Sequence, residues 1–369
     1  MKMIGCDFHP SYQQIAMLDQ GTGEFTEMRL SHQAQGEEAR KFYSALHGPV
    51  RVGLEASGQS QWFERLLAEL GQELWIGDAA KIRASTDRKQ KTDRRDAELL
   101  LQLLVEDRFP RIWVPTVGER DARQLLLHRA KLVRVRTQIK NQLQALALNQ
   151  GVQGKWKLWT VAGRKQLESL ALLPWASRRR TELLKLLDEL DVSITEQDEA
   201  VCQEANTRPE VRRLMTHPGV GPVTALAFAL TLGPAERFRR GKQVGSYFGL
   251  IPSEHSSGGK QRLGHISKQG SSFVRGLLVE AAQSAVRREP QLRREYRRLS
   301  QRRCRALAKV AIARKLAVRL YWMLREEVDY AQLIRGSHAG QPESSRGRNQ
   351  DRSVEWAPCL PEKLGSLKK

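Results

Sequence analysis

The sequence has few cysteines and no long apolar run. Its four cysteines, Cys6, Cys202, Cys304 and Cys359, are far apart and form no Cys-x-x-Cys pair. This spacing supports neither a disulfide framework nor a structural zinc site. No stretch approaches the roughly 18 consecutive apolar residues of a membrane span, and Asp7 lies where a signal peptide would be apolar. We therefore expect a soluble, cytoplasmic protein without a membrane partner.

Acidic residues are fewer than basic ones. The 369 residues include 62 Lys plus Arg against 41 Asp plus Glu, which gives a net charge of +21 and a pI near 10.2. Hydrophobic residues make up 40% and charged residues 28%, so the chain is globular and long enough for two or three domains. A positive excess of this size favours a polyanionic partner, and nucleic acid is the first candidate.

Short apolar segments alternate with amphipathic ones over residues 1–110, which predicts an α/β domain. We expect strands within 3–18 (broken near Pro10) and over 24–30, 50–55 and 73–76, and helices over 37–46, 61–70 and 93–106. This order matches the outline of a ribonuclease-H-like domain. Other mixed α/β folds share parts of the same order, so topology alone does not assign a function.

The rest of the chain is predicted to be mostly helical. A leucine-rich seam in a long helix over 119–150, and a second helix over 181–205, indicate a helical coiled-coil or oligomerisation arm at 111–207. A C-terminal unit at 208–332 holds a Gly-Pro turn, a glycine-rich patch and very basic helices. The composition of residues 333–369 predicts a disordered tail.

Four carboxylates lie at the ends of predicted elements. Asp7 and Glu55 each end a strand, and Asp93 and Asp96 share one face at a helix start because they are three residues apart. Each acid alone would suit an ordinary turn or helix cap. Four converging carboxylates are costly without a cation. Two Mg²⁺ ions about 3.5–4 Å apart would bind these oxygens and serve phosphodiester chemistry, so we predict a two-magnesium site here.

The segments around these acids resemble a known family. They are Gly-Cys-Asp-Phe-His at 5–9, Leu-Glu-Ala-Ser-Gly at 54–58 and Lys-Thr-Asp-Arg-Arg-Asp-Ala at 91–97, with a similar arm segment at 134–142. Together they resemble the DEDD transposases of insertion-sequence family one-ten, including its eleven-eleven subgroup and the Piv-type invertases. The resemblance spans about residues 3–325 and implies a RuvC-like first domain.

A glycine turn at residues 217–222 separates two predicted helices. Gly219 and Gly221 would let backbone N–H groups approach phosphate oxygens at the start of the second helix. The segment is similar to a helix-hairpin-helix motif, which contacts DNA without reading its sequence. A plain turn between two helices is the alternative.

A glycine-rich segment at 253–270 contains several serines. It has no Gly-x-Ser-x-Gly elbow, and the chain shows no recognisable Ser-His-Asp spacing, so by pattern alone it is a flexible basic loop. The family resemblance implies a serine nucleophile that forms a phosphoserine link to DNA. Its position favours Ser257, with Ser256 as the adjacent rival and Ser267 as a weaker candidate. We expect nearby basic residues to hold DNA or RNA phosphates: Lys260, Arg262, Lys268 and Arg275.

The resemblance implies a magnesium-dependent DNA recombinase of a bacterial mobile element, associated with the nucleoid. It further implies a guide RNA encoded by the element and a dimer or tetramer. The sequence offers no recognisable helix-turn-helix reader, which fits specificity delegated to an RNA. Two alternatives stay open: a Holliday-junction-resolvase-like nuclease that uses water as nucleophile, and a non-enzymatic nucleic-acid binder.

Overall fold

A computed structural model of the chain describes residues 1–85, 92–152, 158–256 and 262–339. The described residues fall into two compact units, which divide between Val114 and Pro115. Within the described part of the chain, no helix combines the length and the apolar character needed to cross a membrane. Two segments named above lie partly outside the described residues: the glycine-rich segment, at the positions that include Ser257 and Lys260, and the tail, from residue 340 onward.

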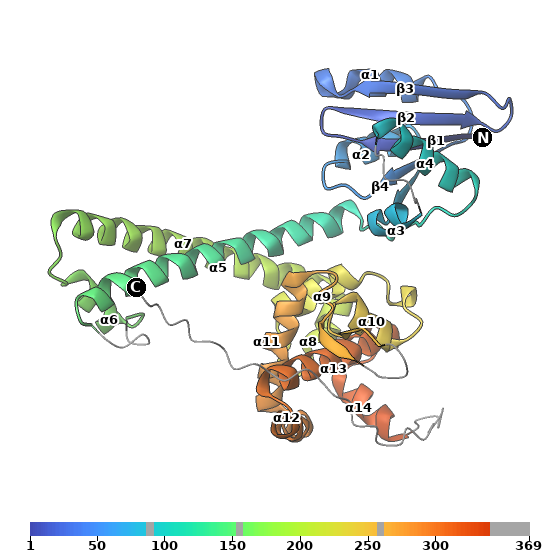
Figure 1. The fold of residues 1–369 in the computed structure, drawn as a ribbon. Coiled ribbons are helices and arrows are strands. Elements are labelled where there is room, and N and C mark those ends of the chain that lie inside the picture. The colour runs from blue at the N-terminus through green and yellow to red at the C-terminus, as the bar shows by residue number, and fades with distance from the viewer. Residues whose placement is uncertain (86–91, 153–157, 257–261, 340–369) are drawn as a thin grey trace. The chain divides into compact units, whose positions relative to one another are not determined.

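The first unit is built on a five-stranded mixed sheet (Figure 1). Its strands are β1 Lys2–Phe8, β2 Tyr12–Asp19, β3 Phe25–Ser31, β4 Val50–Glu55 and β5 Glu73–Gly77, in the order β3-β2-β1-β4-β5. The first three strands are antiparallel neighbours, whereas β4 runs parallel to both β1 and β5. The α/β prediction for this region is confirmed, with the first apolar segment split into two strands around Pro10.

Helices cover both faces of this sheet because side chains alternate along each strand. Ile4 and Cys6 of β1 face one side and pack with α1 and α2, whereas Met3 faces the other side and packs with α3 and α4. The helices are α1 Gln33–Ser44, α2 Gln61–Glu69, α3 Ala79–Ala84 and α4 Asp93–Val105. Helix α3 was not predicted from the sequence.

Two glycines allow α4 to pack directly on the sheet. A Cβ atom on Gly5 of β1 would lie 2.2 Å from the carbonyl oxygen of Ala97 and 2.4 Å from the backbone nitrogen of Leu101. On β4, a Cβ atom on Gly53 would lie 2.8 Å from the side chain of Leu104. Only hydrogen fits at these two positions. The Gly5 contact consequently holds the N-terminal half of α4 close to β1, and the Gly53 contact holds its C-terminal end close to β4.

The second unit begins with a helical hairpin. Helix α5 Val117–Asn149 packs along α7 Pro174–Thr207, and the short α6 Val161–Glu168 closes the far end (Figure 1). The buried seam between them holds leucine and isoleucine side chains, as the sequence pattern predicts: Ile139, Leu143, Leu167, Leu183, Leu184 and Leu187. This pairing takes place within one chain, and oligomerisation through the arm remains a prediction.

The remainder of the second unit is a helical body around the almost completely buried α9. Its elements are α8 Pro209–Met215, α9 Pro222–Leu232, the 3₁₀ turn Ala235–Arg237, α10 Gly241–Tyr247, β6 Pro252–Glu254, β7 Leu263–Ile266, α11 Ser272–Arg288, α12 Pro290–Arg302, α13 Arg305–Arg325 and α14 Tyr330–Ala339. The β6–β7 hairpin was not predicted. Helix α14 extends to Ala339, seven residues into the segment for which the sequence suggests disorder.

Candidate active site

Asp7 and Glu55 lie at the ends of two neighbouring parallel strands. Cys6 pairs with Leu54 in the β1–β4 register, so the next residue on each strand is an acid. Parallel strands lie about 4.8 Å apart, and paired residues point to the same face. Because Gly5 and Gly53 contact α4 and its neighbours, alternation also directs Asp7 and Glu55 to the α4 side of the sheet.

The other two acids lie in the first turn of α4. The Thr92 side chain caps this helix by accepting a hydrogen bond from the backbone N–H of Arg95. Asp93 and Asp96 are both acidic residues of that first turn, where a negative charge interacts favourably with the helix dipole. The predicted helix start and the shared face of the two acids are both present in the structure.

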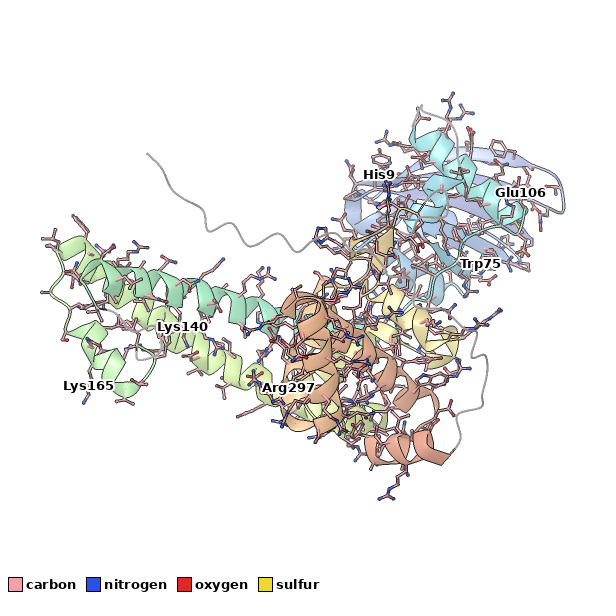
Figure 2. The ribbon with its side chains drawn as sticks, turned by 60° about the horizontal axis from the view of Figure 1, so that its bottom comes forward. His9, Trp75, Glu106, Lys140, Lys165 and Arg297 are labelled. Carbon is pink, nitrogen blue, oxygen red and sulfur yellow. The ribbon has the colours of Figure 1, made fainter. Side chains whose placement is uncertain are left out.

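Asp7 and Asp93 form a compact group with a histidine that the sequence analysis did not select. Ligand-type atoms of Asp7, His9 and Asp93 all lie within 4.8 Å of one another. The Nε2 atom of His9 lies 3.1 Å from Oδ2 of Asp7 and 3.7 Å from Oδ1 of Asp93. His9 follows the end of β1 and is labelled in Figure 2. All three side chains are partly exposed, so the group is accessible from solvent.

Neighbouring groups affect the two aspartates in opposite directions. Burial raises the pKa of Asp7, against the effect of His9, and the negative charges of Asp96 and Asp93 raise it further. The pKa of Asp93 is lowered, chiefly by the hydrogen bond that the Tyr12 hydroxyl donates to its Oδ2 over 2.6 Å. Asp7 is therefore the member of the group whose negative charge is least compensated by the protein.

Tyr12 is itself held in place by two ring contacts. The guanidinium carbon of Arg29 lies 3.6 Å from the centre of the tyrosine ring, and the ring of His9 stacks on it at 4.7 Å. A backbone hydrogen bond from the His9 N–H to the Tyr12 carbonyl closes the turn between β1 and β2. The hairpin thus fixes His9 and Tyr12 on either side of Asp93.

Glu55 and Asp96 lie outside the compact group. A carboxylate oxygen of Glu55 is 3.4 Å from the Arg83 guanidinium of α3, so its charge has a basic partner. Asp96 is close enough to Asp7 to raise its pKa. Of the four predicted acids, the structure brings Asp7 and Asp93 together, keeps Asp96 within electrostatic range, and pairs Glu55 with an arginine.

This donor set suits a hard divalent cation. Carboxylate oxygens are the ligands that Mg²⁺ prefers, and Mg²⁺ commonly uses one or two protein carboxylates. Asp7 and Asp93 provide them at a partly exposed position. A histidine nitrogen would also suit a transition metal such as Mn²⁺ or Zn²⁺. The group is therefore a possible binding site for a divalent metal.

His9, Tyr12 and Arg83 were missed by the sequence analysis. His9 could have been found from its two-residue spacing to Asp7, since alternate residues at a strand end share a face. Tyr12 could have been found from the hairpin register, in which Phe8 pairs with Gln13. Arg83 gives no comparable signal, because α3 is a six-residue helix without a clear apolar period.

The predicted serine loop connects β6 and β7, and Ser257 and Lys260 within it lie outside the described residues. The Ser256 hydroxyl donates a 2.6 Å hydrogen bond to Glu254 and accepts one from the backbone N–H of Arg262. A carboxylate in this position could take a proton from a serine, and the sequence analysis did not consider Glu254. The side chains of Arg262 and Lys268 are exposed. The Ser267 hydroxyl oxygen is buried and has no hydrogen-bond partner among the residues that the structure describes.

Two predicted nucleic-acid-binding residues have structural tasks. Arg275 donates hydrogen bonds to the backbone carbonyls of Phe248 and Gln269, at 3.2 and 2.8 Å. Gly219 has a φ of +87°, and a Cβ atom there would lie 2.4 Å from the backbone nitrogen of Ala285 in α11. These contacts account for both residues without a phosphate. Gly221, in contrast, caps α9 and has open space where a Cβ would be.

Family comparisons cover both the acidic group and the serine loop. Residues 4–150 match a family model described as a transposase, of the DEDD type found in IS110 elements. Residues 211–297 match the model described as "Transposase IS116/IS110/IS902 family". The two matches together span more than half of the chain. The chain belongs to the IS110 family of transposases.

Relatives of this transposase include proteins from several bacteria. It is 27% identical over 339 residues to a "Probable family 20 transposase" of Pseudomonas aeruginosa, which covers 89% of this chain and 98% of the relative. It is 26% identical over 300 residues to the "Transposase for insertion sequence element IS1111A" of Coxiella burnetii, 78% of each chain. A "Pilin gene-inverting protein" of Moraxella bovis is 25% identical over 222 residues, 53% of this chain and 69% of the relative.

The family assignment connects the acidic group with the catalytic domain of the transposase. Asp7, Glu55, Asp93 and Asp96 all fall inside the region that matches the DEDD transposase domain, and the observed sheet fits the RuvC-like fold expected for it. This transposase is therefore an enzyme that cuts and rejoins DNA, with a DEDD domain that indicates divalent-metal use. The predicted resemblance to insertion-sequence transposases and Piv-type invertases is confirmed.

Proposed function

We propose that this transposase cuts DNA through a serine nucleophile and uses Asp7, Glu55, Asp93 and Asp96 to hold Mg²⁺. The observation that carries the proposal is the convergence of Asp7 and Asp93, with ligand-type atoms within 4.8 Å, at the end of β1 in the DEDD region. When bound, Mg²⁺ neutralises charge on the scissile phosphate and stabilises the leaving oxygen.

The acids have distinct positions in this scheme. Asp7 and Asp93 are the primary ligands, and Asp96 adds negative charge beside Asp7. Glu55 would complete the set if its contact with the largely exposed Arg83 side chain were released. Tyr12 and His9 position Asp93 and Asp7 through their hydrogen bonds.

The chemical step conserves the number of phosphodiester bonds. The serine oxygen loses its proton to a base and forms a bond to phosphorus. A bridging P–O bond of the DNA breaks at the same phosphorus, and the released DNA oxygen takes up a proton to become a free hydroxyl end. A hydroxyl end of a second strand then displaces the serine. Because one P–O bond forms for each that breaks, rejoining needs no ATP. A serine hydroxyl is a weak nucleophile and requires this activation.

The nucleophile belongs to the loop between β6 and β7. Ser257 is the first choice because of its place directly before Gly258, and Ser256 is the rival. Glu254 accepts the Ser256 hydrogen bond, which supplies a base at the loop whichever serine reacts. Gly221, Lys260, Arg262 and Lys268 would contact DNA or RNA phosphates, with Gly219 and Arg275 shaping the turn and the loop that carry them.

Target choice by an element-encoded RNA and assembly as a dimer or tetramer complete the proposal. The chain carries a +21 charge that suits nucleic-acid partners. From Ala285 to Arg325 there are fourteen Lys or Arg against two acids. The basic side chains of this stretch would contact the phosphates of a nucleic acid, and such contacts do not by themselves recognise a base sequence.

The test is a search for protein attached covalently to a DNA end. Purified protein is incubated with Mg²⁺, the RNA flanking the element and a labelled pair of donor and target DNAs, then separated on a denaturing gel. We expect a covalent band that is lost in Asp7→Ala and in one of Ser257→Ala and Ser256→Ala. Free cut ends without attached protein would instead indicate a resolvase-like nuclease that uses water, and binding without cutting would indicate a non-enzymatic binder.

A further inference from the structure

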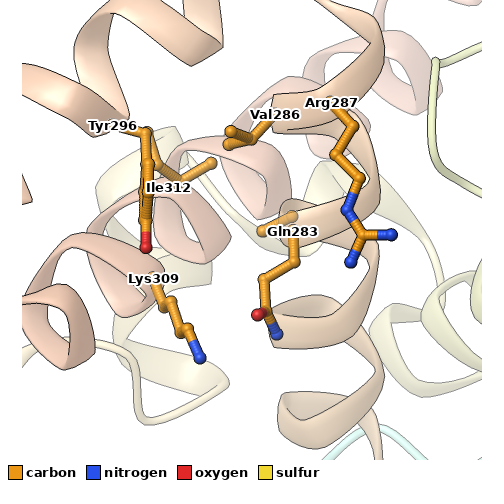
Figure 3. A pocket seen from close by; sticks show the side chains of 7 residues that line it. Gln283, Val286, Arg287, Tyr296, Lys309 and Ile312 are labelled. Carbon is orange, nitrogen blue, oxygen red and sulfur yellow. The ribbon is translucent and has the colours of Figure 1, made fainter.

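A cavity of about 210 Å³ opens among the basic helices of the second unit, between α11, α12 and α13 (Figure 3). Its apolar wall includes Ala282 and Ile312, which are both 1% exposed, so the cavity reaches the core of the unit. Seven residues line it: Ala282, Gln283, Val286, Arg287, Tyr296, Lys309 and Ile312. None of these seven residues belongs to the acidic group or to the serine loop.

The lining combines a flat ring with a few polar groups. Figure 3 shows Tyr296 on one side of the cavity and Gln283 with Arg287 on the other. Among the described residues, no hydrogen bond or ion pair engages the side-chain polar atoms of Gln283, Arg287, Tyr296 or Lys309. An apolar cavity with a few polar groups free to form hydrogen bonds is typical of a binding site for a small ligand that has both apolar and polar parts.

The surroundings select a negatively charged ligand. Helix α12 contains five arginines and one glutamate, and that glutamate, Glu295, is paired with Lys315. Four of the arginines are exposed and, within the described part of the chain, have no ion-pair partner: Arg294, Arg297, Arg298 and Arg302. Arg297 marks this helix in Figure 2. At 100° per residue these arginines lie on the face of α12 turned away from Tyr296, so the positive charges at the cavity itself are those of Arg287 and Lys309.

We infer that this cavity holds one unstacked nucleotide of a single-stranded nucleic acid. The base stacks on the ring of Tyr296 and contacts Val286 and Ile312, while the Gln283 amide bonds to the edge of the base. Arg287 and Lys309 neutralise its phosphates. A paired base in a duplex is stacked on its neighbours and cannot enter, so the cavity distinguishes single strands from duplexes. This inference depends on the proposed function in one respect only, namely that the partner is a nucleic acid.

Oligonucleotide binding to the full-length protein tests this site. The probes are labelled single-stranded DNA and RNA of about 12 nucleotides, which is within the usual site sizes for single strands, and a blunt duplex of the same sequence. We expect Tyr296→Leu to weaken single-strand binding about tenfold, the size of one lost stacking contact, with duplex binding unchanged. Tyr296→Phe keeps the ring and should bind as the wild type does.

Arg297→Ala is the matched control, because Arg297 lies on the same helix but does not line the cavity. It should weaken single strands and duplex alike and reduce the salt dependence of binding by about one phosphate contact. Equal losses for single strand and duplex in Tyr296→Leu, or no loss for either DNA or RNA strands, would overturn the inference. The strand type that shows the loss identifies whether the nucleotide comes from DNA or RNA.

Photocrosslinking tests the site in the wild-type protein, so its result does not depend on whether a variant folds. A single strand that carries 5-iodouracil should crosslink to Tyr296, as located by mass spectrometry, and crosslinks confined to other residues would contradict the site. Asp7→Asn separates this inference from the catalytic proposal. The variant should lose cleavage, yet Tyr296→Leu made in the Asp7→Asn protein should still weaken single-strand binding about tenfold. If Asp7→Asn cleaves normally, the proposed function fails and the nucleotide site is still decided by binding.

Discussion

Each unit contains a cluster of titratable side chains that includes a histidine and a tyrosine, but the two clusters differ in charge balance. In the first unit Asp7, His9, Tyr12 and Asp93 lie together with Asp96 nearby. In the second unit the rings of His217 and Tyr330 pack at a tilt with their centroids 4.4 Å apart, beside the largely buried pair of Glu289 and Arg319. The first cluster gathers negative charge at a partly exposed strand end, whereas the second is buried and neutral overall.

The charges of the buried cluster are paired within it, although among the described residues Nε2 of His217 has no hydrogen-bond partner. Nη1 of Arg319 donates to both carboxylate oxygens of Glu289, at 3.0 and 2.9 Å, a charge-assisted contact made through one nitrogen. Tyr330 donates its backbone N–H to Thr216, and burial followed by its contact with Glu289 raises the pKa of Tyr330 to about 12. These contacts fix α14 against the turn before α9. The comparison indicates that uncompensated charge, rather than the residue types alone, marks the site for chemistry.

The largest expected effect is on cleavage by Asp7→Asn. Loss of a carboxylate that holds a catalytic cation should reduce DNA cleavage by about 10³-fold or more. The same change removes repulsion from Asp93 and Asp96, so the first unit should gain about 1 kcal/mol without metal, or about 4 °C in Tm. A gel assay and thermal unfolding measure the two effects.

Asp19→Asn is the control for this experiment. Asp19 ends β2 of the same sheet but pairs with Lys2 at 3.1 Å, so its charge is compensated. Cleavage should be unchanged and stability slightly reduced, the opposite of Asp7→Asn. Cleavage at the wild-type rate by Asp7→Asn would remove Asp7 from the active site.

The second effect concerns the buried pair. Glu289→Gln leaves the Arg319 guanidinium buried beside a neutral amide, and breaking such a pair costs about 3–5 kcal/mol. The double variant Glu289→Leu with Arg319→Leu removes both charges and should recover much of that loss. Urea unfolding followed by circular dichroism measures both variants. A single variant within about 1 kcal/mol of the wild type would show that the pair is not a structural element.

Sequence patterns predicted the strands that carry the first cluster, but they did not predict the side-chain contacts that complete it. Short apolar runs located β1 and β4, with an acid at the end of each run, because a strand that is buried on both faces is apolar at successive positions. The contact between Tyr12 and Asp93 joins residues 81 positions apart, and it depends on how closely α4 packs on Gly5. The pairing of His217 with Tyr330 has the same origin, since it requires α14 to return to the α9 turn. Such contacts depend on tertiary packing, which no local pattern encodes.

A smaller effect is expected when the pH is changed. Burial lowers the pKa of His217 to about 4, so the unfolded chain binds a proton that the folded chain rejects between about pH 6.5 and 4. The stability of the second unit is therefore complete above pH 6.5 and falls as the pH falls, by about 2 kcal/mol from pH 7 to 5. His217→Phe keeps a ring for Tyr330 to stack on and should lose this part of the pH dependence. Equal pH dependence in both proteins, measured by urea unfolding, would assign the acid sensitivity to other groups.

The smallest expected effect compares one hydroxyl in each cluster. Tyr12→Phe removes the hydrogen bond that lowers the pKa of Asp93, so Asp93 should take up a proton at higher pH. Cleavage should fall about tenfold or less, the value of one charge-assisted hydrogen bond, and the acid limb of its pH profile should move to higher pH. Tyr330→Phe removes the matching hydroxyl beside Glu289 and should change stability without moving that profile. If both variants leave the acid limb in place, Tyr12 has no part in the protonation of Asp93. A shift confined to Tyr12→Phe would show that the same side chain tunes chemistry at the exposed cluster and only holds structure at the buried one.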